Sequence, residues 1–285
     1  MAYKALPYSA KTRATAAMEA ILRNVVRKKS FHFVHGAFSN RFFQTAQEIG
    51  INAICHESAW DVAVDWQNGE IDPDNELIAI THNETSTGVM WPARSLKELR
   101  YKFAEHLIAI DVTSSFGAMA FEWEVGDFWF SSVQKCLGLP SGLALLIVSP
   151  RGFEKTRQKS SAASWQKFEV MAKKMKTYQT VETPNMLGIA LLAKTVQKWD
   201  LSAIEKEIRA GAELINKSGI RNYVKDSAWR SITVANLLVN SPKEWHQRVA
   251  KENIVLGKGY GPLKDSCIRI ANFPATTAFI SKLLL

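Results

Sequence analysis

The sequence predicts an α/β fold, in which a mostly parallel sheet is covered by helices and is followed by a smaller α+β C-terminal part. Several apolar runs continue without alternation, as in Leu77–Thr81 (LIAIT) and Leu143–Val148 (LALLIV). Such runs are typical of strands buried on both faces of a parallel sheet. Segments with helical spacing separate these runs. With 285 residues, 47% of them hydrophobic and 22% charged, the chain can fill such a core and does not suit a disordered protein.

The first half of the chain alternates between helical and strand-like segments. In Thr15–Lys28 the apolar residues recur at helical spacing, and Thr15 is suited to cap the N-terminus of that helix. Two more helices are predicted at Asn40–Glu48 and Ser95–Phe103. The predicted strands are Ser30–Val34, Asn52–Cys55, Leu77–Thr81, Leu107–Val112, Asp127–Ser131 and Leu143–Val148.

After Pro150 the pattern changes to longer helical segments mixed with short strands. The predicted helices are Ala162–Lys176, Asn185–Asp200, Ser202–Ser218 and Ser241–Lys251. The predicted strands are Ser231–Val239, Ile254–Leu256 and Cys267–Ile270. This change predicts two domains, a large α/β domain of residues 1–198 and a small α+β domain of residues 199–285.

The formal net charge of +9 is concentrated in one segment. Arg151–Lys176 contains eight basic and two acidic residues. Runs of charge are usually solvated helical faces, which is the interpretation we favour here, with no nucleic acid as a partner. The alternative, a basic nucleic-acid-binding protein, rests on this segment alone.

The three cysteines, Cys55, Cys136 and Cys267, are far apart. They give neither a disulfide framework nor the spacing of a metal site, so we expect a reducing compartment, the cytoplasm, and no metal. The N-terminal segment has no apolar signal region, and the longest aliphatic run is far below the roughly 20 residues of a membrane-spanning helix. No membrane association is expected.

Polar residues follow the ends of the predicted strands, where the reactive groups of a parallel sheet gather. Asp111 follows one apolar run and Lys135 follows another. A lysine amine among apolar side chains has a lowered pKa and forms a Schiff base with an aldehyde, while a buried carboxylate keeps a pyridine nitrogen protonated. These are the protein groups of a pyridoxal 5'-phosphate (PLP) enzyme. Phe38 offers a ring to stack on the cofactor, and the helix that begins near Thr15 offers N–H groups to its phosphate.

A wider resemblance is carried by seven segments, ATAAMEA (14–20), HGAFSNRF (35–42), THNETSTG (81–88), AIDVTSSFGA (109–118), VGDFWFSSVQKCLGLPSGLALLIVSPR (125–151), TPNMLGIALL (183–192) and IRIANFPA (268–275). Together they resemble the class V aminotransferases, most closely the phosphoserine aminotransferase-like proteins, with alanine–glyoxylate and serine–pyruvate aminotransferases as near relatives. The resemblance implies the type I fold of PLP-dependent transferases, with PLP as the cofactor.

The resemblance assigns five residues to the cofactor ring. Lys135 matches the Schiff-base lysine, and Asp111 matches the partner of the pyridinium nitrogen. Gln134 is expected to hydrogen-bond at the phenolic oxygen side of the ring or at the phosphate. Phe38 is expected to stack on the ring, and Thr85 to approach the phenolic oxygen.

The remaining matches concern the phosphate, the substrate and a second subunit. Ala14, Thr15 and Ala16 match the turn that cradles the cofactor phosphate, which is richer in glycine in relatives. Thr183 matches a residue that relatives contribute to the neighbouring subunit's cofactor phosphate, which implies a homodimer with shared active sites. Arg269 matches the arginine that binds the substrate α-carboxylate in two-pronged geometry.

Each assignment has a structural alternative. Asp111 is also suited to cap a strand end, Thr85 to lie in a turn, Phe38 to fill a core and Arg269 to lie on a surface strand. Cys136, beside the lysine, is expected to be a packed thiol.

The expected function is transamination of a small amino acid, namely phosphoserine, serine or alanine, with a 2-oxo acid. The amino donor and acceptor stay open. A cysteine desulfurase is a weaker alternative, because such relatives have His where Gln134 stands. Members of the family are longer at both ends, so the chain is expected to be shortened, with Thr276–Leu285 too short for the last helix. A non-catalytic remnant that binds PLP and dimerises is the other alternative.

Overall fold

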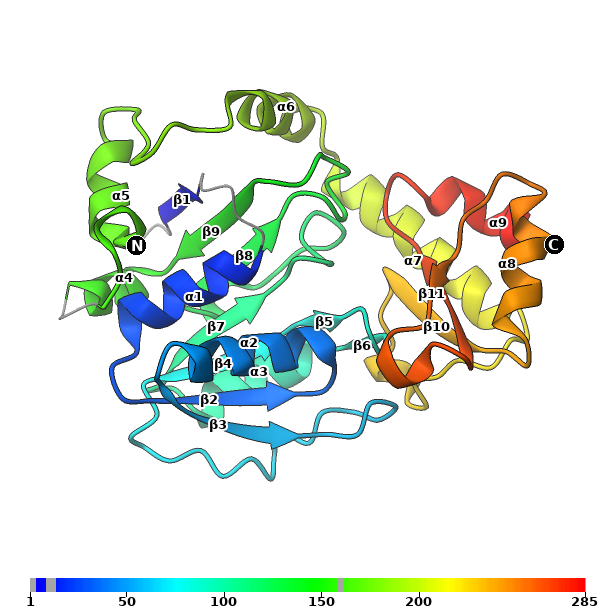
Figure 1. The fold of residues 1–285 in the computed structure, drawn as a ribbon, viewed down its shortest axis with the longest axis horizontal. Coiled ribbons are helices and arrows are strands. Elements are labelled where there is room, and N and C mark those ends of the chain that lie inside the picture. The colour runs from blue at the N-terminus through cyan, green and yellow to red at the C-terminus, as the bar shows by residue number, and fades with distance from the viewer. Residues whose placement is uncertain (1–3, 9–13, 158–160, 285) are drawn as a thin grey trace.

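The computed structural model describes residues 4–8, 14–157 and 161–284. Its largest sheet has the strand order β1-β9-β8-β7-β4-β2-β3 (Figure 1). In that order the strands are Lys4–Tyr8, Ala144–Val148, Phe128–Ser132, Leu107–Asp111, Leu77–Thr81, Lys29–Val34 and Asn52–Glu57. The strands from β8 to β3 pair in parallel, whereas β9 is antiparallel to β8 and β1 is antiparallel to β9. The mostly parallel sheet is therefore confirmed, with an antiparallel edge that the sequence did not indicate.

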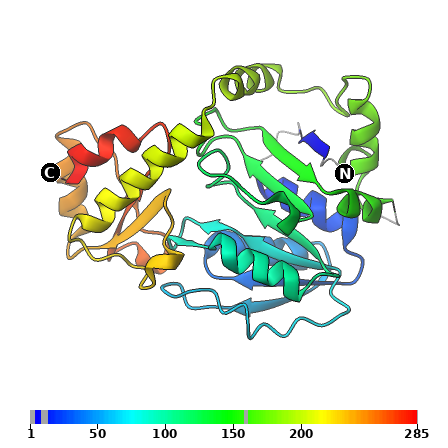
Figure 2. The ribbon, with the colours of Figure 1, turned by 180° about the vertical axis from the view of Figure 1, so that it is seen from behind.

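Helices cover both faces of this sheet. One face carries α1 (Ala14–Val25), α2 (Ala37–Glu48), α4 (Pro150–Thr156) and α5 (Phe168–Met175), and the other carries α3 (Ala93–Lys102), which lies in front in Figure 2.

The apolar run of β4 shows why the sequence produces this arrangement. Leu77 and Ala79 join the core beneath α1 and α2, while Ile78 and Ile80 join the core on the opposite face. All four side chains are at most 1% exposed. Because successive residues of a strand point to opposite faces, a run without polar residues requires apolar cover on both sides.

The C-terminal part of the chain is built on a second sheet, which lies apart from the first in Figure 1. Its strand order is β10-β12-β11, all antiparallel, and helices α7, α8 and α9 accompany it. The bounds are α6 Met186–Gln197, α7 Leu201–Lys217, β10 Val234–Leu238, α8 Pro242–Ala250, β11 Gly257–Lys258, β12 Cys267–Ala271 and α9 Ile280–Leu284. The smaller α+β part is confirmed, whereas the domain boundary at residue 198 stays a prediction.

Two predictions about the C-terminal part are wrong. Ile254–Leu256 is not a strand, because this segment closes the end of α8, where the N–H of Ile254 bonds to the carbonyl of Val249. Pairing with β12 begins only at Gly257. The end of the chain does form a helix, α9, because Ile280 and Leu283 are buried in the core beside the second sheet.

Three helical segments also differ from the predictions. The second helix begins at Ala37, so Phe38 lies in its first turn and not in the preceding loop. The helix predicted at Ala162–Lys176 is a 3-10 turn, Ser164–Gln166, followed by α5. Helix α4 was not predicted, although Ser149 accepts a hydrogen bond from the N–H of Gly152 as its cap and Pro150 opens it. No helix within the described parts of the chain is long and apolar enough to cross a membrane.

Candidate active site

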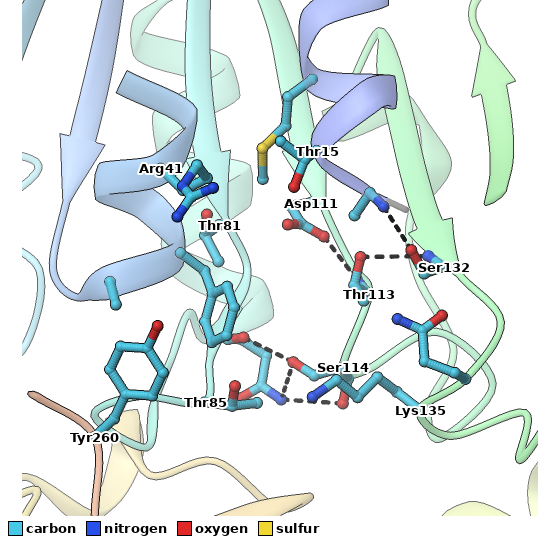
Figure 3. A pocket seen from close by; sticks show the side chains of 16 residues that line it. Thr15, Arg41, Thr81, Thr85, Asp111, Thr113, Ser114, Ser132, Lys135 and Tyr260 are labelled. Carbon is cyan, nitrogen blue, oxygen red and sulfur yellow. Dashed lines mark hydrogen bonds between the residues drawn. The ribbon is translucent and has the colours of Figure 1, made fainter. Parts of the chain in front are cut away.

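A pocket lies at the edge of the large sheet where the parallel strands end (Figure 3). Thr81, Asp111 and Ser132 are the last residues of β4, β7 and β8, and all three line it. The parallel direction of these strands places their carboxyl ends side by side, which explains why residues far apart in sequence meet here.

Lys135 reaches this pocket from the connection between β8 and β9. Its Nζ lies 6.0 Å from the ring centroid of Phe38 and 5.9 Å from that of Phe273. Burial, and next the positive charge of Arg269, lower the pKa of the lysine amine, and the nearby carboxylates offset only part of this effect. The amine is therefore more easily deprotonated than an ordinary lysine, as a nucleophile requires.

Asp111 presents a buried carboxylate to the same pocket. Its side chain is held by the backbone N–H of Thr113, which donates to Oδ1 at 2.9 Å. Burial raises the pKa of Asp111 to about 6, although the hydrogen bonds from Thr113 act in the opposite direction. A cationic N–H group in the pocket would lower this pKa again, because an opposite charge favours the ionised form.

Three polar side-chain atoms at the pocket have no hydrogen-bond partner. They are Thr81 Oγ1, Asn83 Oδ1 and Gln134 Oε1, and all three are buried. Since buried polar atoms are normally paired, these orphans indicate a polar ligand.

The first turn of α1 forms one wall of the pocket. The N–H of Ala14 donates to Ser132 Oγ at 2.6 Å, and the side chain of Thr15 is exposed beside it. An α-helix N-terminus carries unpaired N–H groups and a positive partial charge, which suits an anion.

The structure brings most of the predicted site residues together. The pocket is lined by Ala14, Thr15, Phe38, Thr85, Asp111, Gln134 and Lys135. Ala16 lies outside this lining and packs against the core beneath α1. Arg269 also lies outside, on β12, but its Nη1 donates to the carbonyl of Thr85 at 3.3 Å, at the edge of the pocket. Thr183 is exposed and precedes α6.

Two residues close to the site, Cys136 and His82, do not line the pocket. Cys136 is buried and donates to the carbonyl of Ser114 at 3.2 Å, and burial raises its pKa to about 12, so it is a packed thiol as predicted. His82 lies outside the pocket lining, where its Nδ1 shares a hydrogen bond of 2.7 Å with Ser115 Oγ, and burial lowers its pKa to about 4.

Sequence reasoning missed several lining residues, among them Arg41, Asn83, Thr113, Ser114, Ser132 and Tyr260. Asn83, Thr113, Ser114 and Ser132 stand at strand ends, where polarity was a usable signal. Tyr260 had no local signal, because its ring comes from the C-terminal part of the chain and lies 5.7 Å from that of Phe38.

Comparisons with known proteins agree with this geometry. The class-V aminotransferase family model matches residues 15–259. A phosphoserine aminotransferase from Rhodococcus jostii (strain RHA1) is 29% identical, over 92% of this chain and 73% of that protein. A serine–glyoxylate aminotransferase from Arabidopsis thaliana is 26% identical, over 93% of this chain and 72% of that protein.

Solved structures show the same relationship. A crystal structure of a phosphoserine aminotransferase from Cytophaga hutchinsonii superposes with a TM-score of 0.92 at 35% identity, covering 99% of this chain and 81% of that one. An alanine–glyoxylate aminotransferase from Nostoc sp. shares the fold, with a TM-score of 0.83 at 22% identity over 98% of this chain and 80% of that one. The family match spans most of the chain, and the solved relative agrees in both fold and sequence. The chain therefore belongs to the class-V aminotransferase family of PLP-dependent enzymes and is similar to its phosphoserine aminotransferases.

Proposed function

We propose that this chain moves an amino group between a small amino acid and a 2-oxo acid, with PLP as cofactor and phosphoserine, serine or alanine as donor. The observation that carries the proposal is the convergence of the Lys135 amine and the Asp111 carboxylate on one pocket bounded by the ring of Phe38. The similarity to phosphoserine aminotransferases supports phosphoserine among the three donors.

The pocket fits PLP in three respects. The buried carboxylate of Asp111 suits a protonated ring nitrogen, the NH2 group of the Gln134 side chain can donate to an oxygen substituent, and the first turn of α1 suits a phosphate. Ala14 and Thr15 would hold the phosphate, and Ala16, whose side chain packs against the core, would add only its backbone N–H. Phe38 would stack on the ring, and Thr85 would approach its phenolic oxygen. When bound, PLP supplies an aldehyde for an amine and a protonated pyridine ring that withdraws electrons.

Three residues of the chain have separate proposed roles in the reaction. Lys135 would hold the cofactor through Nζ, and the same amine would serve as the base that takes the substrate α-proton and as the acid that returns it. The carboxylate of Asp111 would keep the ring nitrogen protonated. Arg269 binds the α-carboxylate, since its guanidinium lies beside Thr85 at the pocket edge.

We further propose a homodimer formed through α6. Met186, Leu187 and Val196 of this helix are 64%, 70% and 50% exposed, so apolar side chains are left uncovered on a helix of which Gly188 is the buried residue. Thr183 precedes this helix and is exposed, as expected for a residue offered to a neighbouring subunit. Leu187→Lys should shift the protein from dimer to monomer in sedimentation velocity.

The domain division at residue 198 and the cytoplasmic location stay part of this proposal. The boundary would fall between α6 and α7, and Cys55, Cys136 and Cys267 are free thiols.

Cofactor spectroscopy tests the proposed function. Added PLP should give a visible absorption band that borohydride removes, leaving a mass increase on the peptide that contains Lys135, and Lys135→Ala should lack both. Titration with phosphoserine, serine and alanine should convert the band to that of pyridoxamine phosphate for the true donor. Cofactor binding without conversion by any amino acid would instead support the non-catalytic alternative, and a colourless protein would refute both.

A further inference from the structure

Glu84 lies beside the pocket with its carboxylate completely buried. It ends β5 (Asn83–Glu84), a short strand paired with β6 (Val89–Met90), and its exposed fraction is 0%. Its Oε2 accepts hydrogen bonds from the N–H groups of Phe38 at 2.9 Å and Ser39 at 2.8 Å, and from Ser39 Oγ at 3.1 Å.

The second carboxylate oxygen is also occupied. Oε1 accepts from the N–H of Ser86 at 3.1 Å and from Ser86 Oγ at 2.6 Å. Ser86 Oγ in turn accepts from the N–H of Ala37 at 2.9 Å. Glu84 and Ser86 therefore bind the first N–H groups of α2, which would otherwise lack partners within the helix.

This carboxylate replaces a local cap. Helix α2 begins after Gly36, which has no side chain to cap it, so the capping group comes from a distant segment. A Cβ at position 36 would overlap the side chain of Glu84 and would lie 2.6 Å from Ser86 Oγ. The glycine thus leaves the space that the carboxylate fills. Burying an ionised group is costly without strong donors, and the helix N-terminus supplies them.

The groups that Glu84 holds are groups of the proposed cofactor site. It bonds directly to the backbone of Phe38, and Thr85 follows it in the chain. The carbonyl of Thr85 accepts from Arg269 Nη1 at 3.3 Å, so the same short segment also contacts the proposed carboxylate-binding residue.

We propose that Glu84 is a positioning residue of the cofactor site, which fixes the ring of Phe38 and the Thr85 segment at the spacing that the cofactor ring needs. This inference rests on the proposed function. Glu84 also acts on the same site through its charge: burial raises the pKa of Asp111 and Glu84 adds to this, whereas burial lowers the pKa of Lys135 and of Arg269 and Glu84 offsets a small part of it. A merely structural role would stabilise α2 and leave cofactor affinity unchanged.

The test measures the dissociation constant of PLP, and of pyridoxal without its phosphate, by titrating the visible band. Glu84→Gln keeps the shape but turns an NH2 group toward N–H or O–H donors. We expect about tenfold weaker binding of both compounds, because the ring surface and not the phosphate site is disturbed. Circular dichroism of the bound cofactor should change as well.

A double-mutant cycle asks whether the effect passes through Phe38. Phe38→Ala alone should raise the dissociation constant of PLP by about tenfold or more, because the stacking on the ring is lost. If Glu84 acts through that ring, adding Glu84→Gln to Phe38→Ala should weaken binding by less than about twofold further. Fully additive losses would refute the positioning role, and so would unchanged affinity in Glu84→Gln.

Asp127→Asn is the matched control, because Asp127 is another buried carboxylate but precedes β8, at the opposite edge of the sheet. It should lower the melting temperature and leave both dissociation constants unchanged, and an equal loss of affinity in this control would overturn the proposal. If Glu84→Gln does not fold, Ser86→Ala is the second variant, because it removes one donor to the carboxylate. It should weaken PLP binding a few-fold by disturbing the position of Phe38. Wild-type protein that binds no PLP would refute the proposed function and this inference together, whereas normal wild-type binding with an unaffected variant refutes only the inference.

Discussion

Asp111→Asn should stabilise the cofactor-free protein while it abolishes transamination. Burial raises the pKa of Asp111 from 3.8 to about 6, so its ionised form is disfavoured in the folded state. At roughly 1.4 kcal/mol per pKa unit, this difference makes ionised Asp111 destabilising by about 3 kcal/mol. The penalty is absent below about pH 4, where the group is protonated in both states. It grows as the pH rises toward about 6 and is constant above that value.

Urea unfolding of the cofactor-free proteins, at equal concentration, tests this expectation. Asp111→Asn should unfold at higher urea at pH 8, by an amount equivalent to about 3 kcal/mol, and the gain should vanish near pH 4. Saturating PLP should reverse the order at pH 8, because only the carboxylate can pair with a protonated ring nitrogen. A variant no more stable than wild type at pH 8, or a gain independent of pH, would refute the reasoning.

Three further predictions concern groups around the site and beneath it. Arg269→Lys should raise the KM of the amino acid by about a hundredfold without moving the cofactor band, since lysine lacks the two-pronged geometry, and steady-state kinetics with the absorption spectrum checks this. Asp127→Ala should lower the free energy of unfolding by about 3 kcal/mol at pH 7, as measured in urea, because the carboxylate lies 2.7 Å from Arg151 and 2.9 Å from Arg100 and its loss removes both ion pairs. Burial raises the pKa of Asp127, but the hydrogen bond from Arg151 and both positive charges outweigh this and lower it. The wild-type advantage should therefore hold above about pH 4 and disappear as the pH falls through the lowered pKa. Gly36→Ala should lower the free energy of unfolding by about 1–3 kcal/mol and also weaken PLP binding, because the added methyl group displaces Glu84. Calorimetry and a cofactor titration measure the two effects, and a loss of stability without a loss of PLP affinity, or the reverse, would contradict the prediction.

The sheet and the centre of the site were predictable because both depend on local pattern. The run Leu77–Thr81 predicted a strand covered on both faces, and the core clusters on either side of β4 confirm it. Parallel strands end at one edge of a sheet, and this rule predicted that Asp111 and Lys135 lie close together without any knowledge of side-chain contacts.

The features that sequence reasoning missed depend on distant partners. Strand β1 includes Pro7, which usually argues against a strand, yet β1 lies at the edge of the sheet, where a missing N–H is tolerated. Tyr260 and the capping role of Glu84 likewise arise only when segments far apart in the chain meet.

The antiparallel pairing of β8 with β9 has a consequence for turnover. Ser132 pairs with Ala144 across this hairpin, and the N–H of Gly138 bonds to the carbonyl of Lys135 at 3.0 Å, so the lysine lies in a connection held at both ends. A helical crossover, as found after a parallel strand, would return the chain to the sheet through a longer path. In the proposed reaction, an Nζ that the substrate amine had released would stay near the site, at an effective concentration far above that of a free amine in solution. The local chain connectivity would thereby favour rapid recapture of the cofactor after each cycle.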